Sequence, residues 1–562
     1  MLKSISGRII LPVSYEQHEL TRHLLNILKT QSELTSKQLQ LMLMPYAYWL
    51  NSSFNPAKMA HGTAIEFKGL DTIARLNPYL ADFTEKLPNS IEINFEDTQN
   101  NGPSLSHTED KKSLKLSLSL TEPYKNWQAL AELFNIIAKE YPKPDFNIHE
   151  AHILGHTHAV KQTVLVEKPF ADLRLFETDH EGPLLYIAAP ISGHYTTLIS
   201  DTISSALNAG FRVAVYDIKN ARDVPLEHGD FGLDECVDYH REFITYLSQN
   251  IDPRVNVQAI CQGTVPVSIA AATLAEEKSP YTPYTLTLDA GPINVEASET
   301  EVTAFGKKHD LDWFKNNLIS KVPSSYEGQG RMVYPAFRQL SAFIAMNPEH
   351  HAHSFYEMFN HMVKGTQDDQ SFKKKSEFYE EYLSGADLTA KFYLDTIKNI
   401  FIENKLAKGT MKWRSKKVDL SAYKGPLLTK EAREDDICAP AQTMFAHELM
   451  PKAKGYHYTL DNAGHYGIFS GSKARDKALP AMFTFIHKKL NDKGHDYGPL
   501  LDSYGNEIED AKMPSRYNKK LFERTVTEQK EKWESLVNNR GKTKDFELPQ
   551  ITLKLPAFNM TK

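Results

Sequence analysis

The stretch V255-N-V-Q-A-I-C-Q-G-T-V-P-V-S-I-A-A-A-T-L-A275 joins an apolar, strand-like run to an alanine-rich, helix-like run. Cys261 stands at the junction, with Ala259 two positions before it and Gly263 two positions after it. A nucleophile elbow needs small residues there, because its nucleophile sits on a sharp, strained turn from strand to helix. The stretch therefore matches G-x-S-x-G with Ala for the first Gly and Cys for Ser. A buried cysteine at a strand end is also common, so the motif alone leaves both interpretations open.

Strand-like and helix-like runs alternate on both sides of this stretch. Such alternation predicts an α/β fold with a mostly parallel sheet and helices on both faces. Helix-like patterns cover 197–207 and 233–247. The strand-like runs are 163–167, 171–177, 184–189, 211–217, 255–260, 284–289, 426–430 and 456–460.

The rhythm breaks between residues 300 and 420, where the chain is long, aromatic and helix-like. An insertion of this size usually forms a cap over the carboxyl ends of the strands, where α/β sites lie. The resulting domain prediction is a helical N-terminal extension over 1–140 with a polar linker near 96–120, the first part of the core over 141–299, a helical cap over 300–420, the second part of the core over 421–490, and a charged C-terminal extension over 491–562.

Composition excludes several classes of protein. The 562 residues carry a formal net charge of -6, so nothing in the overall charge indicates nucleic-acid binding. The three cysteines form neither a metal-binding motif nor a disulfide framework. The apolar run near the N-terminus is too short for a signal peptide, and no stretch is long enough for a membrane helix. We therefore expect a cytoplasmic protein without a transmembrane segment, a metal or another cofactor.

Two further segments complete a candidate catalytic triad. Asp435 and Asp436 follow the strand-like run at 426–430, and His465 lies in the glycine-flanked loop after 456–460. The chain order of nucleophile, acid and histidine is that of the α/β-hydrolases. We choose Asp436 as the acid because it stands four residues before a proline that turns the chain, and we keep Asp435 in reserve.

The residue types define the expected chemistry. His465 takes the proton from Cys261, because the thiolate is the reactive form of cysteine. The acid holds the imidazole in the correct tautomer and stabilises the imidazolium. The oxyanion of the tetrahedral intermediate would accept hydrogen bonds from the backbone N–H of Gln262 and of Ile191 or Ser192, in the loop after the strand at 184–189.

The blocks of sequence around these residues resemble one family, the intracellular poly(3-hydroxyalkanoate) depolymerases of the α/β-hydrolase superfamily. The similarity runs from roughly 141 to 486, and Gly263 departs from the proline usual in the family. The similar blocks are AAPISGHYTTL, YDIKNARDVPLEHGDFGLDECVDY, AICQGTVPV, AGPIN, GRMVYPAFRQL, FYEEYL and DNAGHYGIFSG.

The resemblance implies a Cys–Asp–His triad, which falls on Cys261, Asp436 and His465. It implies cleavage of 3-hydroxyalkanoate esters, chiefly of 3-hydroxybutyrate, through an acyl-cysteine, with water or coenzyme A as acyl acceptor. It also implies a polymer or granule surface as partner, and the apolar run LMLMPYAYWL at 41–50 would suit such a surface. The oligomeric state is left open.

Two alternatives remain. A polyhydroxyalkanoate synthase shares the fold and the cysteine, but its G-x-C-x-G-G elbow has glycine where Ala259 and Thr264 stand here. A granule-bound scaffold with an inactive site is the other alternative, and the complete set of triad residue types argues against it. The run at 347–353 carries His350, His351 and His353, but no acid or cysteine cluster completes a metal site.

Overall fold

The computed structural model of the protein describes residues 64–68, 90–96, 104–107, 113–119, 129, 132–133, 136, 141–340, 348–509, 512–540 and 551–554. The chain divides into two compact units. The larger unit is Lys143–Tyr334 with Ala386–Thr543, and the smaller unit is Met1–Pro142 with Pro335–Gly385 and Lys544–Lys562.

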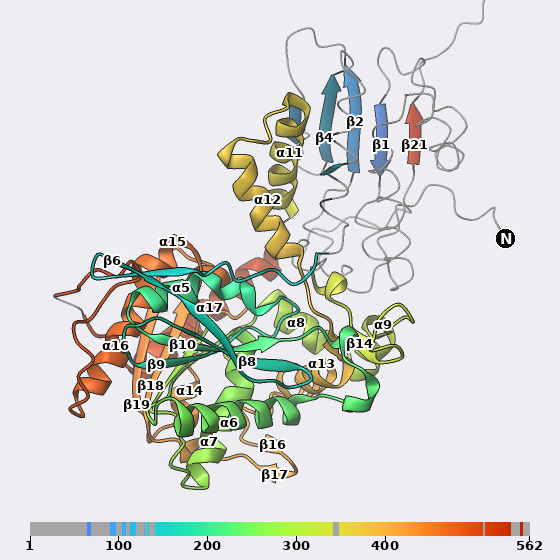
Figure 1. Ribbon diagram of the computed structural model, residues 1–562. Helices are drawn as coiled ribbons and strands as arrows, with labels where there is room; N and C mark the ends of the chain where they lie inside the picture. Colours follow the sequence, from blue (N-terminus) through green and yellow to red (C-terminus); the bar gives the residue numbers. More distant parts are fainter. Residues whose placement is uncertain are drawn as a thin grey trace, which may run out of the picture. The chain divides into compact units, whose positions relative to one another are not determined.

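The centre of the larger unit is a nine-stranded sheet in the order β20-β19-β18-β12-β11-β9-β10-β8-β7 (Figure 1). The run from β19 to β10 is parallel, whereas β8, β7 and β20 are antiparallel to their neighbours. The strands are β7 (Lys161–Val166), β8 (Ala171–Glu177), β9 (Leu184–Ala188), β10 (Arg212–Ile218), β11 (Asn256–Ile260), β12 (Thr285–Asp289), β18 (Pro426–Ala432), β19 (Lys454–Leu460) and β20 (Ser515–Arg516). An antiparallel second strand and exchanged third and fourth strands define the α/β-hydrolase fold, so the predicted fold class is confirmed.

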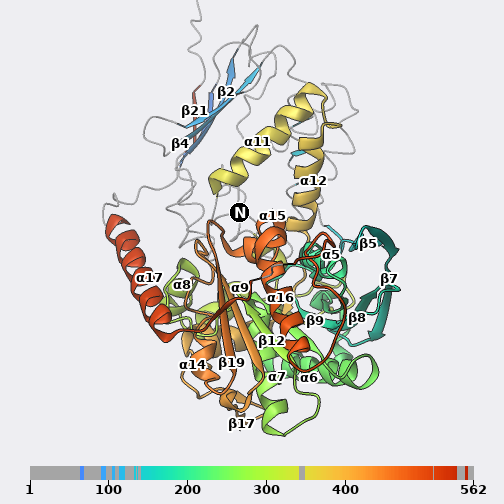
Figure 2. The same ribbon diagram turned by 90° about the vertical axis from the view of Figure 1, so that its left-hand side faces the viewer.

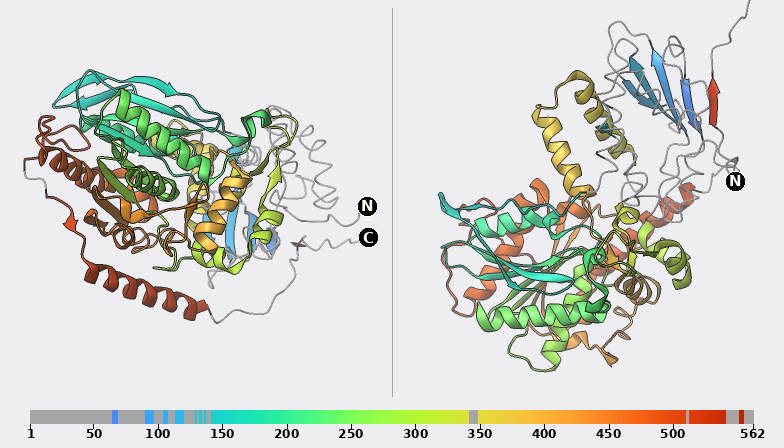
Figure 3. Two further views of the ribbon diagram at one scale, coloured as in Figure 1. Left: turned by 90° about the horizontal axis from the view of Figure 1, so that it is seen from below. Right: turned by 45° about the vertical axis from the view of Figure 1, so that its right-hand side comes forward.

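Helices cover both faces of this sheet. On one face, α5 (Ser200–Asn208) packs against α16 (Leu479–Asn491), and on the other α6 (Leu233–Asn250) packs against α7 (Thr264–Glu276) (Figures 1 and 2). Seen from below, α6 and α7 lie in front of the sheet (Figure 3, left). Every residue of β9, β11 and β12 is buried. Cover on both faces explains why these strands read as continuous apolar runs rather than as alternating ones.

The helix after the elbow is buried on almost all sides. All residues of α7 from Thr264 to Leu274 are buried, which explains its run of alanine and small apolar side chains. Pro266 lies in its first turn, where backbone N–H groups have no partner within the helix, so the proline breaks no hydrogen bond.

The stretch predicted as a helical cap contributes elements to both units. In the larger unit, α13 packs against both α6 and α9, and the rings of Tyr334 and Tyr393 stack at 3.9 Å between centroids. That the stretch covers the site stays a prediction. Its elements in the larger unit are α8 (Glu301–Lys308), α9 (Leu311–Leu318), β13 (Ser320–Lys321), β14 (Met332–Tyr334), β15 (Leu388–Thr389), α13 (Ala390–Thr396), a π-helix η7 (Ile397–Ile402), β16 (Lys412–Trp413) and β17 (Lys416–Lys417).

The smaller unit differs from the predicted helical extension. It holds a five-stranded sheet in the order β21-β1-β2-β4-β3, and the helices α11 (Pro348–Lys364) and α12 (Gln370–Leu383), which pack against each other. The strands are β1 (Ala64–Lys68), β2 (Ser90–Glu96), β3 (Ser104–His107), β4 (Ser113–Ser119) and β21 (Ile551–Lys554). The description of 1–140 as helical, with a linker near 96–120, is therefore wrong for β1 to β4. The apolar run at 41–50 lies outside the described residues.

The C-terminal extension contains the helix α17 (Lys519–Arg540), which is charged and largely exposed. Among the residues that the structure describes, no helix combines the length and the apolar character needed to cross a bilayer.

Candidate active site

Cys261 occupies a strained corner between β11 and α7. A single turn of 3-10 helix, Cys261–Gly263, joins the two elements, and Cys261 has a φ of +54°. This left-handed conformation is costly for a residue other than glycine and is typical of the nucleophile in an elbow. A Cβ on Gly263 would lie 2.8 Å from the carbonyl oxygen of Ala189, so a side chain at that position would collide with backbone. The predicted strand–turn–helix elbow is present.

Thr264 holds the elbow from the helix side. Its hydroxyl donates a hydrogen bond of 2.7 Å to the carbonyl oxygen of Cys261. The Thr264 side chain fits because Gly291 faces it, and a Cβ on Gly291 would lie 1.9 Å from the Thr264 hydroxyl oxygen. The glycine in the loop after β12 therefore leaves room for a threonine side chain at position 264.

The strand register brings the predicted site segments to one edge of the sheet. Ile260 pairs with Asp289, Asp289 pairs with Lys430, and Lys430 pairs with Tyr458. These four residues lie at one level on parallel neighbours, so the segments that follow them leave the sheet on the same side. The elbow, the acidic turn and the histidine loop meet at the carboxyl edge, where ligands bind in α/β sheets.

The carboxylate that holds His465 belongs to Asp435. His465 Nδ1 lies 2.8 Å from Asp435 Oδ2, and both side chains are buried. Asp435 Oδ1 accepts hydrogen bonds of 2.8 Å from the backbone N–H groups of Ile437 and Cys438, which turn its second oxygen toward the imidazole.

The choice of Asp436 as triad acid is therefore wrong, and the contact expected of it is made by Asp435. Asp436 is exposed, because the turn directs alternate side chains to opposite sides. The backbone N–H of Glu434 donates to the carbonyl oxygen of Ala463 at 3.0 Å, which ties the acidic turn to the loop of His465.

The surroundings of Cys261 lower the pKa of its thiol. The pKa of Cys261 is lowered to about 5 by the hydrogen bond from the Cys438 thiol and, against the opposing effect of burial, by the charge and hydrogen bond of His465 and the backbone N–H of Gln262. Burial by itself lowers the pKa of His465, but the Asp435 carboxylate and the Cys261 sulfur outweigh it and hold that pKa well above its usual value. The site thus favours a thiolate beside an imidazolium, which is the reactive form of a catalytic cysteine.

Cys438 was given no role from the sequence. It follows Asp435 by three residues in the same turn, its backbone N–H donates to Asp435 Oδ1, and its side chain is buried.

The segments that carry the expected oxyanion donors lie at or beside the elbow. Gln262 directly follows Cys261 in the elbow, which is the position expected for a backbone donor after a nucleophile. The loop after β9 begins against Gly263, and Gly193 turns that loop with a φ of +83°. Ile191 and Ser192 are buried in the loop, and their role as donors stays a prediction.

The candidate triad is shielded from solvent. Cys261, Asp435 and His465 are 6%, 1% and 5% exposed. The rings of Tyr466 and Phe469 stand edge-on to the His465 imidazole, with centroids 5.7 and 5.9 Å away. This apolar cover strengthens the electrostatic interactions among the three side chains.

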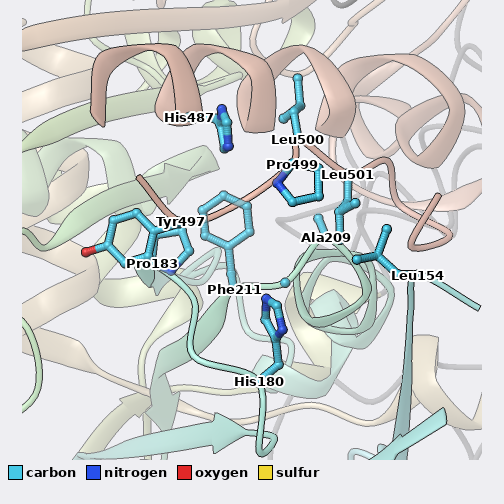
Figure 4. Close-up of a pocket in the computed structure, with 11 residues that line it drawn as sticks. Leu154, His180, Pro183, Ala209, Phe211, His487, Tyr497, Pro499, Leu500 and Leu501 are labelled. Atoms are coloured by element: carbon cyan, nitrogen blue, oxygen red, sulfur yellow. The ribbon is translucent and has the colours of Figure 1, made fainter. Parts of the chain in front are cut away.

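A separate pocket lies at the other end of the sheet (Figure 4). It includes Pro183 and Phe211, the residues that directly precede β9 and β10, together with His180, His487 and Tyr497. Cys261 follows the carboxyl end of β11, which runs parallel to β9, so this pocket opens far from the candidate triad.

No group of three or more histidine, cysteine or acidic residues suited to a metal ion is present among the described residues. The side chains of His350, His351 and His353 lie outside those that the structure describes.

Fold and site together define a protein of the α/β-hydrolase fold with a cysteine at the nucleophile position. A family model described as "PHB de-polymerase C-terminus" matches residues 290–490, which include the acidic turn and the histidine loop. The chain is 22% identical over 337 residues to the poly(3-hydroxyalkanoate) polymerase subunit PhaC of Haloferax mediterranei, covering 58% of this chain and 62% of that protein. It is 25% identical over 103 residues to the subunit of the same name from a Synechocystis species, covering 18% of this chain and 27% of that protein. The chain therefore spans less than two thirds of either relative.

Solved structures with the same type of core include the α/β hydrolase GrgF from a Penicillium species, at 11% identity and a TM-score of 0.38, covering 59% of this chain and 99% of that one. A carboxylesterase of the thaumarchaeon Nitrososphaera is similar at 14% identity and a TM-score of 0.35, covering 58% of this chain and 99% of that one. These scores are low, and the fold follows from the strand order and register of the sheet.

Proposed function

We propose that the protein is an acyl-transfer enzyme of polyhydroxyalkanoate metabolism that works through an acyl-cysteine at Cys261. The observation that carries the proposal is the buried Asp435–His465 pair at the carboxyl edge of the sheet together with Cys261 at a strained elbow, where the pKa of the Cys261 thiol is lowered by its surroundings. A side chain kept in this state is what nucleophilic catalysis requires, and an inert core cysteine would have its pKa raised by burial.

The polymer is proposed as substrate because two independent comparisons point to it. The family model that covers residues 290–490 is named for a depolymerase, and the two curated relatives are named as polymerase subunits. Both names refer to chemistry at the same 3-hydroxyalkanoate ester bond, which one enzyme would form and the other would break.

The polymerase direction is the better supported of the two. The curated relatives favour this alternative over the depolymerase that the sequence resemblance implied. The objection to synthesis was that Ala259 and Thr264 stand where a synthase elbow has glycine. Gly291 answers the part that concerns Thr264, because it provides the space that this side chain needs. Burial of the triad also suits transfer to a bound hydroxyl, since it limits access of competing water.

In this direction, the Cys261 thiolate attacks the thioester carbonyl of a 3-hydroxyacyl-coenzyme A. The carbon–sulfur bond to coenzyme A breaks, and the departing thiolate takes the proton of the His465 imidazolium. The hydroxyl of a second hydroxyacyl unit then attacks the acyl-cysteine while His465 accepts its proton. An ester forms, and Cys261 returns as a thiolate facing an imidazolium.

Depolymerisation is the second candidate, and the family model over 290–490 supports it. Here Cys261 attacks a polymer ester, His465 protonates the departing alkoxide, and water or the thiol of coenzyme A takes the acyl group from the cysteine. The inactive scaffold has little support, because a decayed site would not retain a cysteine at the elbow together with a buried histidine–carboxylate pair.

A single set of incubations tests the proposal. The purified full-length chain is given either 3-hydroxybutyryl-coenzyme A or amorphous poly(3-hydroxybutyrate), and the acid-quenched protein is searched by mass spectrometry for an acyl group on Cys261. Polymer with release of coenzyme A supports synthesis, and soluble hydroxyacids support depolymerisation. The Cys261→Ala variant must form neither product. Absence of an acyl-cysteine with both substrates would contradict the proposed function.

Association with polymer granules inside the cell belongs to the same proposal. The enzyme would meet its substrate at the surface of a granule, because the polymer is apolar and insoluble. Co-sedimentation of the Cys261→Ala variant with washed granules, compared with an unrelated protein of similar charge, tests this association without turnover.

A further inference from the structure

The β9 loop, residues 189–195, carries the expected oxyanion donors Ile191 and Ser192. The whole loop is buried, and Gly193 turns it with a φ of +83°. A backbone donor stabilises an oxyanion only from a fixed position, and a displacement of about 1 Å can lower a rate about a hundredfold. The contacts that hold this loop therefore bear on the chemistry at Cys261.

The end of the β9 loop is tied to β10 and to the segment after it. The Thr196 hydroxyl donates to the carbonyl oxygen of Tyr216 at 2.9 Å and accepts a hydrogen bond of 3.0 Å from the N–H of Ile218. Asn220, two residues beyond the end of β10, donates from Nδ2 to the hydroxyl oxygen of Tyr195 at 3.1 Å. One asparagine side chain thus joins the β9 loop to the segment after β10.

The same asparagine binds a third segment. The chain re-enters the larger unit at the return segment, Ala386–Thr389. Asn220 Oδ1 accepts a hydrogen bond of 3.0 Å from the N–H of Asp387. The carbonyl oxygen of Asp387 in turn accepts one of 3.1 Å from the N–H of Ala221. The return segment is therefore fixed to the segment after β10 from both sides of one residue.

The return segment also contacts the β9 loop directly. The N–H of Ala386 donates to the carbonyl oxygen of Gly193 at 2.8 Å. All the partners in this arrangement are buried, and Asn220 itself is only 4% exposed. Because a buried polar group that loses its partner is costly, these bonds favour one arrangement of the loop.

We propose that Asn220 is a positioning residue for acyl transfer, which fixes the β9 loop by joining it to the segment after β10 and to the return segment. It acts through the backbone of the loop and takes no part in the proton transfers of His465. The inference rests on the proposed function in one respect, which is that Cys261 becomes acylated. It does not depend on which ester or thioester the enzyme takes.

Two reactions of the same sulfur separate positioning from general damage. With 4-nitrophenyl acetate, the Cys261 thiolate adds to the ester carbonyl, negative charge develops on the carbonyl oxygen, and 4-nitrophenolate leaves as the acetyl-cysteine forms. With iodoacetamide, the same thiolate displaces iodide, and no oxyanion forms. Only the first reaction needs donors for an oxyanion.

Both rates are read by mass spectrometry on the peptide that contains Cys261, in the acid-quenched full-length chain. In Asn220→Ala we expect acylation to fall by about ten- to a hundredfold and alkylation to stay within about twofold of the native rate. Tyr195→Phe removes only the hydroxyl that Asn220 binds. It should lower acylation by a smaller factor, of at least about threefold, and leave alkylation native.

Asn208→Ala is the matched control. Asn208 also bridges two backbone segments, because its Oδ1 accepts from the N–H of His152 at 2.8 Å and its Nδ2 donates to the carbonyl oxygen of Ser503 at 3.0 Å. It ends α5 directly before Ala209 and Gly210, which line the pocket at the opposite end of the sheet. Both rates should therefore stay native in this variant.

The inference is overturned if Asn220→Ala acylates at the native rate, or if its alkylation falls as far as its acylation. Where Asn220→Ala fails to fold by circular dichroism, the same two criteria apply to Tyr195→Phe. A native chain that is alkylated but not acylated would also overturn the inference, because no working oxyanion site would then exist beside Cys261. A native chain that is not alkylated would overturn the proposed nucleophile, and the inference with it. The polymer incubations use other substrates, so their failure leaves this result readable.

Discussion

Replacing Asp435 with asparagine should disable the site without unfolding it. Asp435 Oδ1 accepts two backbone N–H groups, from Ile437 and Cys438. An asparagine oxygen will stay in that place, because an amide nitrogen cannot accept hydrogen bonds. The amide nitrogen then replaces Oδ2 and donates to His465 Nδ1. The imidazole proton is forced to the other ring nitrogen, which can no longer take a proton from Cys261.

The size of the effect follows from the geometry of the pair. His465 Nδ1 and Asp435 Oδ2 are 2.8 Å apart, and both side chains are buried. Unit charges separated by about 4 Å interact by about 4 kcal/mol at an effective dielectric constant of about 20. At about 1.4 kcal/mol per tenfold change, loss of this interaction lowers the rate of acyl-cysteine formation by about a thousandfold.

The assay is single-turnover formation of the acyl-cysteine, with the rate of Cys261 alkylation near neutral pH as a second readout that needs no acyl substrate. Asp436→Asn is the matched control, because it removes the same charge from an exposed neighbour in the same turn. It should change either rate by less than about threefold, in keeping with the small effect of exposed charges. Equal losses in the two variants, or native rates in Asp435→Asn, would refute the assignment of the acid.

Three further changes probe the frame around the site. Gly263→Ala places a Cβ 2.8 Å from the Ala189 carbonyl oxygen. It should lower the free energy of unfolding by about 1–3 kcal/mol and also lower the rate of Cys261 alkylation. A native alkylation rate would contradict the close approach of the backbone. Lys430→Ala leaves the buried Asp289 carboxylate, 3.1 Å from Lys430 Nζ, without its ion-pair partner, and should cost about 3–5 kcal/mol in urea denaturation. Burial lowers the pKa of His457 to about 3. Below about pH 6.5 the unfolded chain therefore binds a proton at this histidine that the folded chain does not bind. The free energy of unfolding should fall by about 2 kcal/mol per such histidine as the pH drops from about 6.5 to about 5. His457→Gln should flatten that slope, and an unchanged slope would count against a neutral buried imidazole.

The core of the larger unit could be predicted because its signals are local. The alternation of strands and helices, the elbow at Cys261 and the loop of His465 depend on turn residues and on the period of apolar residues. The smaller unit had a local signal too, since S90-I-E-I-N-F-E96 and S113-L-K-L-S-L-S119 alternate with a period of two. That period indicates strands, although the residues before it are helix-like.

The second position after the nucleophile shows how a motif can mislead. A synthase motif has glycine where Ala259 and Thr264 stand, so the motif by itself disfavours synthesis. The requirement is for space, and Gly291 supplies it from a loop that follows the next strand. A pattern of residues within one segment cannot register compensation that comes from another segment.

The amino-acid sequence by itself determined the fold class, the elbow and the kinds of residue in the triad, because these follow from local backbone preference and burial. Only the tertiary structure decided between Asp435 and Asp436, since their directions depend on which N–H groups the turn offers to each carboxylate. It alone also brought the acidic turn against the loop of His465, because a contact between remote turns exists only after parallel strands have aligned their ends.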